Sequence, residues 1–191
     1  MANVVPYRGV HYNLERIENL SDVVTQPYDK ITPEMQKAYY QKSPYNIVRL
    51  ILGKEEPGND KEHNKYTRAN QYLRDWMRQG VMIRDESPNF YASFQEFNVG
   101  DRTFVRKGFV ALLDMTDADV KAHEQTLRGP KEDRLKLFRA TESFFGHIFI
   151  LFPDPEKEVL EILNRVAENA TPSYQAEAEH SVKHYLWNIT Q

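Results

Sequence analysis

The stretch from His123 to Leu135 is the part of this chain best suited to chemistry. His123 and Glu124 are neighbours, and a histidine can carry protons near neutral pH while a carboxylate can orient it or bind magnesium. We assign this pair the catalytic role, with Thr126 as a supporting residue. Sequence neighbours point to different sides of a regular element, so an ordinary surface pair is the alternative. No His/Asp cluster has metal-ligand spacing, and no metal ligand is assigned.

Lys131, Asp133 and Arg134 follow Gly129-Pro130, where a loop is expected to turn into a helix. The first N–H groups of a helix are unpaired and carry partial positive charge, so cations there are unfavourable unless an anion is bound. We therefore predict that Lys131 and Arg134 bind an anion, with phosphate as the natural ligand. Asp133 complements the helix dipole as a supporting residue. A solvated charged face is the alternative.

Two further arginines, Arg49 in the apolar run 46–52 and Arg106 in a strand-like segment, are also assigned to anion binding. A guanidinium among buried neighbours needs a carboxylate or phosphate partner. Ion pairs with the chain's own carboxylates are the alternative. Asp29, in Pro27-Tyr28-Asp29, is assigned as a supporting residue at a turn or cap.

Hydrophobic periodicity and turn residues predict the elements that position these side chains. Helices are expected to begin near Pro33, Asp60, Pro130 and Pro155. Strands are expected within residues 4–12, 46–52, 81–84, 90–97, 102–113, 147–152, 174–179 and 182–189. Residues 46–52 read as an inner strand and 147–152 as a buried one. The order predicts an α+β fold, with a mixed, largely antiparallel sheet and about four helices packed on it.

Length and composition limit the class of protein. The 191 residues suit one α+β domain over residues 1–191, and the absence of cysteine excludes disulfides and fits a cytoplasmic location. The 25 basic and 28 acidic residues are mixed along the chain, which argues against nucleic acid as a partner. The apolar run 148–152 is too short to cross a bilayer, so no membrane association is expected. No phosphate-binding Walker loop, Gly-x-Gly-x-x-Gly or nucleophile elbow is present.

Several short segments occur in a fixed order and together suggest a family. They are Pro27-Tyr28-Asp29, Pro44–Leu50, Phe90-Tyr91 with Gln95, Arg106-Lys107-Gly108, His123–Thr126, Asp133-Arg134-Leu135, and Ile148-Phe149 with Asp154. In this order they resemble the amino-terminal half of the bacterial and archaeal proteins grouped as domain-of-unknown-function family 1015. Members of that family are longer, and their second half carries an Asp-Gly-His-His-Arg motif that has no match here.

The resemblance implies a function through that second half. Its motif is similar to one in ParB-like and sulfiredoxin-like proteins, which include free-serine kinases. The resemblance thus implies a phosphotransferase-like protein that transfers a phosphoryl group to serine or a similar small hydroxyl metabolite, using magnesium and a nucleotide or pyrophosphate. This chain would be its amino-terminal half and incomplete as an enzyme.

The resemblance also bears on partners and alternatives. The expected partners are a small anionic metabolite and either a second copy in a homodimer or the absent carboxy-terminal half. A non-catalytic module that recognises a phosphorylated metabolite or a protein partner is the main alternative. A DNA-related role by analogy with ParB-like proteins conflicts with the acidic balance of the chain.

Overall fold

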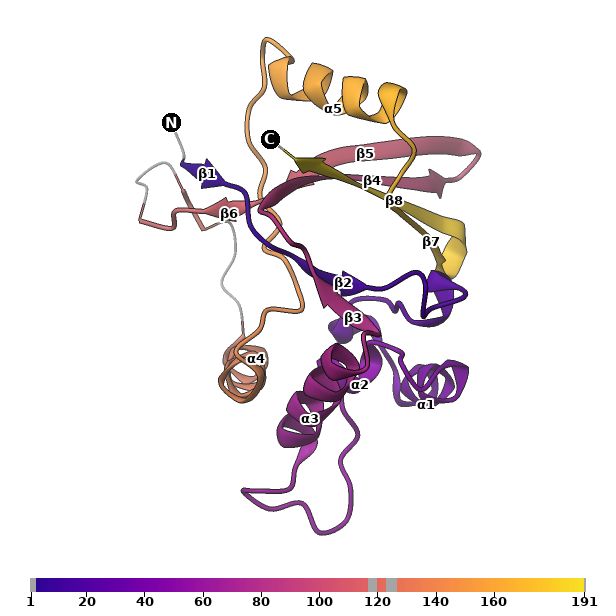
Figure 1. Cartoon of the computed structure of the whole chain (residues 1–191), viewed down its shortest axis with the longest axis vertical. Coiled ribbons are helices and arrows are strands. Elements are labelled where there is room, and N and C mark those ends of the chain that lie inside the picture. Colours follow the sequence, from indigo (N-terminus) through magenta and orange to yellow (C-terminus); the bar gives the residue numbers. More distant parts are fainter. Residues whose placement is uncertain (1–2, 117–119, 123–126, 191) are drawn as a thin grey trace. The chain divides into compact units, whose positions relative to one another are not determined.

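The computed structural model describes residues 3–116, 120–122 and 127–190 (Figure 1). Five α-helices and eight β-strands lie within these ranges, together with three short 3-10 helices at Leu20–Asp22, Tyr28–Lys30 and Glu179–Ser181. The predicted α+β class is confirmed. In the described part of the chain, no helix is long and apolar enough to span a membrane.

Contacts between residues divide the chain into two compact units, each discontinuous in sequence. The first unit contains residues 1–10, 84–121 and 148–191, and the second contains 11–83 and 122–147. Strands β2 (Val10–Tyr12) and β3 (Met82–Arg84) pair with each other where the chain passes between units. The single domain over residues 1–191 stays a prediction, because dividing the chain by its contacts does not show which parts fold independently.

The first unit is built on a four-stranded antiparallel sheet in the order β5-β4-β8-β7. Its strands are β4 (Asn89–Val99), β5 (Arg102–Val110), β7 (Tyr174–Ala178) and β8 (Val182–Thr190). Gly100 closes the predicted β4–β5 hairpin with a φ of 59°, a left-handed conformation that glycine adopts without a Cβ clash. A separate antiparallel pair joins β1 (Val4–Val5) to β6 (Leu112–Leu113).

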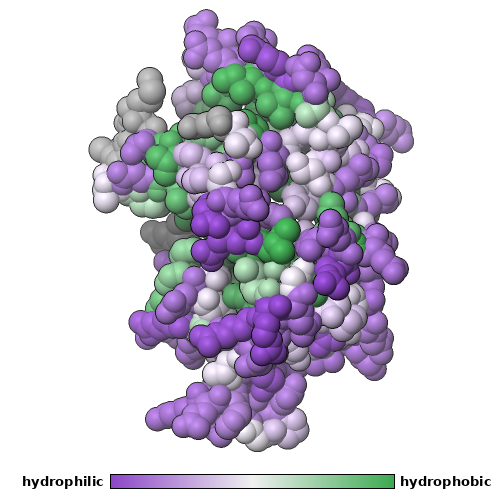
Figure 2. All heavy atoms as spheres, in the orientation of Figure 1, coloured by the Kyte–Doolittle hydropathy of each residue, from purple (hydrophilic) through white to green (hydrophobic). Residues whose placement is uncertain are grey.

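Helix α5 (Glu158–Asn169) packs on the sheet of the first unit (Figure 1). Its buried Leu163 meets Ala92 and Phe94 of β4 and Trp187 of β8 in one apolar core. In Figure 2 the outer side of α5 is hydrophilic, with hydrophobic atoms directly beneath it. The helix begins at Glu158, later than the start expected near Pro155, and its N-cap is Lys157; the Asp154 carboxylate, before this cap, still accepts the N–H of Leu160 at 3.0 Å.

The second unit contains four α-helices and an apolar core. The helices are α1 (Pro33–Lys42), α2 (Val48–Ile51), α3 (Lys65–Arg78) and α4 (Arg128–Thr141). The buried residues of the core, to which α2 and α3 contribute, are Tyr12, Ile17, Val23, Leu50, Trp76, Val81 and Met82. Helix α3 begins at Lys65 and not near Asp60, because Asn64 Oδ1 accepts the N–H groups of Tyr66 and Thr67 and so caps the helix there.

Residues 46–52 were wrongly predicted as an inner strand, since α2 occupies residues 48–51. Asn46 is fully buried; its Nδ2 donates to the carbonyl of Asp22 at 2.8 Å, and its Oδ1 accepts the N–H of Val48 at 3.0 Å. These side-chain bonds start a helical turn and override the strand preference of the β-branched residues.

Residues 147–152 were also wrongly predicted as a buried strand. The described residues 148–152 form no strand, and Leu151 is 84% exposed. A continuous apolar run favours a buried strand only when a neighbouring strand supplies its hydrogen bonds, and the sequence could not show whether one does.

Candidate functional site

A carboxylate with three side-chain donors lies where α3 and α4 meet in the second unit. Tyr66 Oη donates to Asp133 Oδ1 at 2.8 Å, and Lys65 Nζ lies 3.2 Å from the same oxygen. The other oxygen, Oδ2, accepts Arg134 Nε at 3.0 Å and Arg134 Nη2 as well. We call these four residues the Asp133 cluster.

The ionisation of the Asp133 cluster follows from these bonds. Burial works against a charged Asp133, but hydrogen bonds from Arg134 and Tyr66 outweigh it and hold its pKa below the ordinary value. Burial also raises the pKa of the Tyr66 phenol, and its bond to Asp133 adds to the effect. Burial alone would lower the pKa of Lys65, yet its contacts with Glu55 and Asp133 raise it. Near neutral pH the cluster therefore holds charged Lys65, Arg134 and Asp133 beside a protonated phenol.

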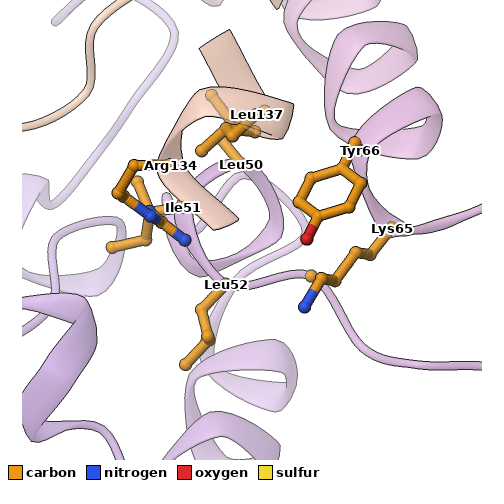
Figure 3. Close-up of a pocket in the computed structure, with 8 residues that line it drawn as sticks. Leu50, Ile51, Leu52, Lys65, Tyr66, Arg134 and Leu137 are labelled. Carbon is orange, nitrogen blue, oxygen red and sulfur yellow. The ribbon is translucent and has the colours of Figure 1, made fainter. Parts of the chain in front are cut away.

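A small, shallow hollow lies beside this cluster (Figure 3). It is lined by Leu50, Ile51, Leu52, Gly53, Lys65, Tyr66, Arg134 and Leu137. Figure 3 shows the polar ends of Lys65, Tyr66 and Arg134 turned toward one another above Leu52. The lining thus combines two cations, one hydroxyl group and apolar walls, and it includes no carboxylate of the described residues.

The position of Arg134 is set by a tyrosine as well as by Asp133. The guanidinium carbon lies 4.0 Å from the centre of the Tyr28 ring, within the range of a cation–π contact. Gly53 packs tightly on the other side of the hollow, since a Cβ there would come within 3.1 Å of the Lys65 Cβ. A side chain at residue 53 would therefore displace the first residue of α3.

The structure places the remaining predicted residues apart from this hollow or outside its description. His123, Glu124 and Thr126 lie outside the described residues. Lys131 is exposed on α4, and its side chain bonds to no described residue. Asp29, in the 3-10 helix that contains Tyr28, is exposed.

Arg49 and Arg106, the two arginines that were assigned to anion binding from strand-like segments, contact aromatic rings and no carboxylate of the described residues. Arg49 Nη2 donates to the carbonyl of Tyr40 at 2.9 Å, and its guanidinium lies 4.3 Å from the Tyr40 ring centre. Arg106, in the first unit, is exposed; its Nη1 donates to Gln95 Oε1 at 3.2 Å, and Phe149 lies 5.3 Å away. Neither forms an ion pair with a carboxylate among the described residues.

The family described as "Protein of unknown function (DUF1015)" matches residues 4–191. The chain belongs to this family. The resemblance expected from the ordered segments is confirmed at that level, while the relation to ParB-like and sulfiredoxin-like proteins stays a prediction. No curated protein and no solved structure matches the chain.

Of the family segments, Tyr28 and Asp133-Arg134 meet at the candidate site. Lys65 and Tyr66 were missed as site residues, because the spacing of Tyr66 with Ala69, Tyr72 and Leu73 indicates only the buried face of a helix. A cation on the first turn of a helix, the argument applied to Lys131, would also have pointed to Lys65, which opens α3.

The implied magnesium ion can be tested against the described donors. No group of three or more His, Asp or Glu side chains within the described ranges could hold a metal ion. The carboxylate oxygens of Asp133 already accept from Lys65, Tyr66 and Arg134, and this cationic surrounding does not suit Mg²⁺. The Asp133 cluster therefore fits an anion beside it better than a metal within it.

Proposed function

We propose that this chain is the metabolite-binding part of a phosphotransferase-like protein, and that its hollow beside Arg134 holds a small phosphorylated hydroxyl compound such as phosphoserine. The observation that carries the proposal is the convergence of Lys65, Tyr66 and Arg134 on one hollow whose described lining contains no carboxylate. Hydrogen bonds to an ionised phosphate are stronger than neutral ones, and apolar walls strengthen them further.

A bound phosphate would compete with the Asp133 carboxylate for Arg134. Arg134 now bonds to Asp133, so a bound phosphate takes over the N–H groups of Arg134 while Lys65 and Tyr66 keep the carboxylate. Lys131 precedes Arg134 by three residues and thus shares its side of α4. The Lys131 ammonium group has no partner among the described residues, so in the proposal it adds positive potential on that side of α4, outside the hollow.

The role in phosphoryl transfer follows from the same charges. Phosphotransferases work mainly by positioning the reactants and by stabilising charge on the transferring group, which cations of this kind provide. In the proposal, His123 and Glu124 supply acid–base groups, and the carboxy-terminal half of a longer family member contributes the binding of a nucleotide or pyrophosphate. The chain is then a half-site, and turnover requires both halves.

A non-catalytic binding module is the second candidate. It is supported by the absence of a general base from the described lining of the hollow, where Tyr66 has a raised pKa and the two cations carry no acceptor. Such a module would recognise the same phosphorylated metabolite without converting it.

Binding is tested by titrating the chain with phosphoserine in a calorimeter. We expect Arg134→Ala to weaken binding by roughly tenfold, the value of one charge-assisted hydrogen bond. Lys136→Ala is the matched control, since Lys136 is an exposed cation on the same helix. Circular dichroism shows whether each variant is folded. Equal affinities for Arg134→Ala and the unchanged chain would refute the site.

Catalysis is tested separately by adding the carboxy-terminal half of a longer family member. The mixture is incubated with serine, Mg²⁺ and ATP, ADP or pyrophosphate, and phosphoserine is measured. The phosphotransferase hypothesis expects product only when both halves are present. Tight binding of phosphoserine without any product would favour the binding module.

A further inference from the structure

A second group of cations lies around Tyr40, on α1 of the second unit. The Arg49 guanidinium carbon and the Lys54 Nζ lie 4.3 and 4.2 Å from the centre of the Tyr40 ring. Arg49 also lies 5.7 Å from the Tyr72 ring centre. Arg68 joins the group through its Nη2, which donates to the Lys54 carbonyl at 2.7 Å. We call Tyr40, Arg49, Lys54 and Arg68 the Tyr40 cluster.

Several donors of the Tyr40 cluster lack an acceptor within the described part of the chain. Lys54 Nζ contacts the Tyr40 ring and no carboxylate. Arg49 uses Nη2 for the Tyr40 carbonyl, whereas its buried Nε has no hydrogen-bond partner. Tyr40 Oη accepts the N–H of Lys54 at 3.1 Å, and its own proton has no acceptor among the described residues. Unmade hydrogen bonds of this kind are costly.

The charges of the Tyr40 cluster do not balance. Among the described residues, the one carboxylate within ion-pair distance of its cations is that of Glu56, whose Oε1 lies 3.6 Å from Arg68 Nε and whose side chain is 54% exposed. Arg49, Lys54 and Arg68 are therefore three cations facing one exposed acid. Like charges held this close repel one another unless an anion lies among them.

The loop that carries Lys54 is held in place by contacts that do not involve the Lys54 ammonium group. Arg68 Nη1 donates to Asn59 Oδ1 at 2.9 Å and its Nη2 to the Lys54 carbonyl, so it fixes both ends of residues 54–59. This loop lies at the foot of Figure 1 and is hydrophilic in Figure 2. Arg68 thus has hydrogen bonds to the protein through Nη1 and Nη2, and we assign it a contribution of positive charge and no direct contact with a ligand.

We infer that the Tyr40 cluster is a second anion-binding site, separate from the hollow beside Arg134, and that its ligand is a dianionic phosphate group. Tyr40 Oη, Arg49 and Lys54 Nζ supply the donors, and Arg68 supplies positive potential. A phosphate with a charge near −2 at neutral pH balances the excess positive charge of the cluster, which a singly charged carboxylate would not. The group is either free phosphate or the phosphate of an ester.

The site is tested on the full chain by nuclear magnetic resonance. Sodium phosphate and glycerol phosphate are the two probes, and they distinguish the free ion from an ester. The Lys54 amide reports directly, because its N–H bonds to Tyr40 Oη. We expect a saturable shift of this amide with at least one probe, and the tighter of the two identifies the ligand class. No saturable shift with either probe would overturn the inference.

Two variants locate the binding. Lys54→Met keeps the side-chain stem on the Tyr40 ring and removes the charge, and we expect about tenfold weaker binding. Tyr40→Phe keeps the ring and removes the hydroxyl group, and we expect a smaller loss. Lys136→Met is the control for net charge, and thermal unfolding confirms that each variant folds. Equal binding by Lys54→Met and Lys136→Met would also overturn the inference.

The two sites are told apart by Arg134→Ala. If the sites are separate, this variant leaves the shift of the Lys54 amide unchanged while it weakens the response of the Tyr66 amide beside the hollow. If Arg134→Ala abolishes the Lys54 response, phosphate binds only in the hollow and the second site is refuted. Loss of the Tyr66 response alone leaves the Tyr40 cluster standing, whichever way the proposed function is decided.

Discussion

The Asp133 and Tyr40 clusters hold cations in the same unit by different means. Lys65 and Arg134 share the carboxylate of Asp133, and Lys65 also meets Glu55 at 3.1 Å. Arg49 and Lys54 rest on the Tyr40 ring, which offers a negative face but no formal charge. Pairing with acids therefore stabilises the fold and reduces the positive charge left for a ligand, whereas stacking on aromatic rings keeps that charge available.

Of the substitutions considered, Asp133→Asn should lower the free energy of unfolding the most. Lys65 and Arg134 have side chains only 22% and 29% exposed, and they would lose their shared negative charge. We expect urea unfolding to show a loss of about 2 kcal/mol, below the value for a fully buried pair. Phosphoserine should bind more tightly, because its competitor for Arg134 is weakened. An unchanged unfolding free energy would show that the paired cluster does not stabilise the fold.

Low pH should also reduce the contribution of the Asp133 cluster to stability, but by less than Asp133→Asn does. The pKa of Asp133 lies below its ordinary 3.8 in the folded chain, so its contribution to stability is present above the pKa of the unfolded chain. This contribution is lost as the pH falls through the lower pKa of the folded state. Urea unfolding between about pH 5 and 2 should show a steeper loss of stability for the unchanged chain than for Asp133→Asn. Parallel curves would contradict the depressed pKa.

Tyr40→Leu tests the ring-stacked cations. The change removes both cation–π contacts and the hydroxyl group that accepts the Lys54 N–H, and we expect a loss of about 1 kcal/mol in the free energy of unfolding. Tyr40→Phe keeps the ring and should lose about half as much. If both variants lose the same amount, the hydroxyl bond and not the ring stabilises this region.

Glu132→Gln supplies the baseline of an exposed pair. Glu132 Oε1 lies 2.7 Å from Arg128 Nε one turn away on α4, but the two side chains are 53% and 92% exposed. Solvent screening limits such a pair to no more than about 0.5 kcal/mol, which chemical denaturation should confirm. A larger loss would mean that exposure is a poor guide to the strength of the Asp133 cluster as well.

Elements with local start and stop residues were predictable from the sequence. Thr32 caps α1 as expected, with its hydroxyl accepting the Met35 N–H at 3.3 Å, and the turn at residues 98–101 joins β4 to β5. The runs 46–52 and 147–152 failed because apolar character alone cannot show whether a strand finds a partner or whether a residue such as Asn46 starts a helix.

The candidate site was predictable only in part, for a similar reason. Arg134 and Asp133 stand on one helix and were singled out from it, but Asp133 was assigned to the helix dipole and not to side-chain partners. Tyr66, which donates to it, is 67 residues away, and a long-range contact of this kind leaves no local pattern. Arg49 was expected to need an acid or phosphate, and the structure gives it the rings of Tyr40 and Tyr72.

The interleaved order of the two units has a consequence for synthesis on the ribosome. The second unit is interrupted by residues 84–121, so Lys65 and Tyr66 emerge well before α4 exists. The wall of the hollow formed by Arg134 and Leu137 can close only after the hairpin of the other unit has left the exit tunnel. Nascent chains should therefore expose Leu50 and its neighbours for a time, and chaperones would meet this surface first.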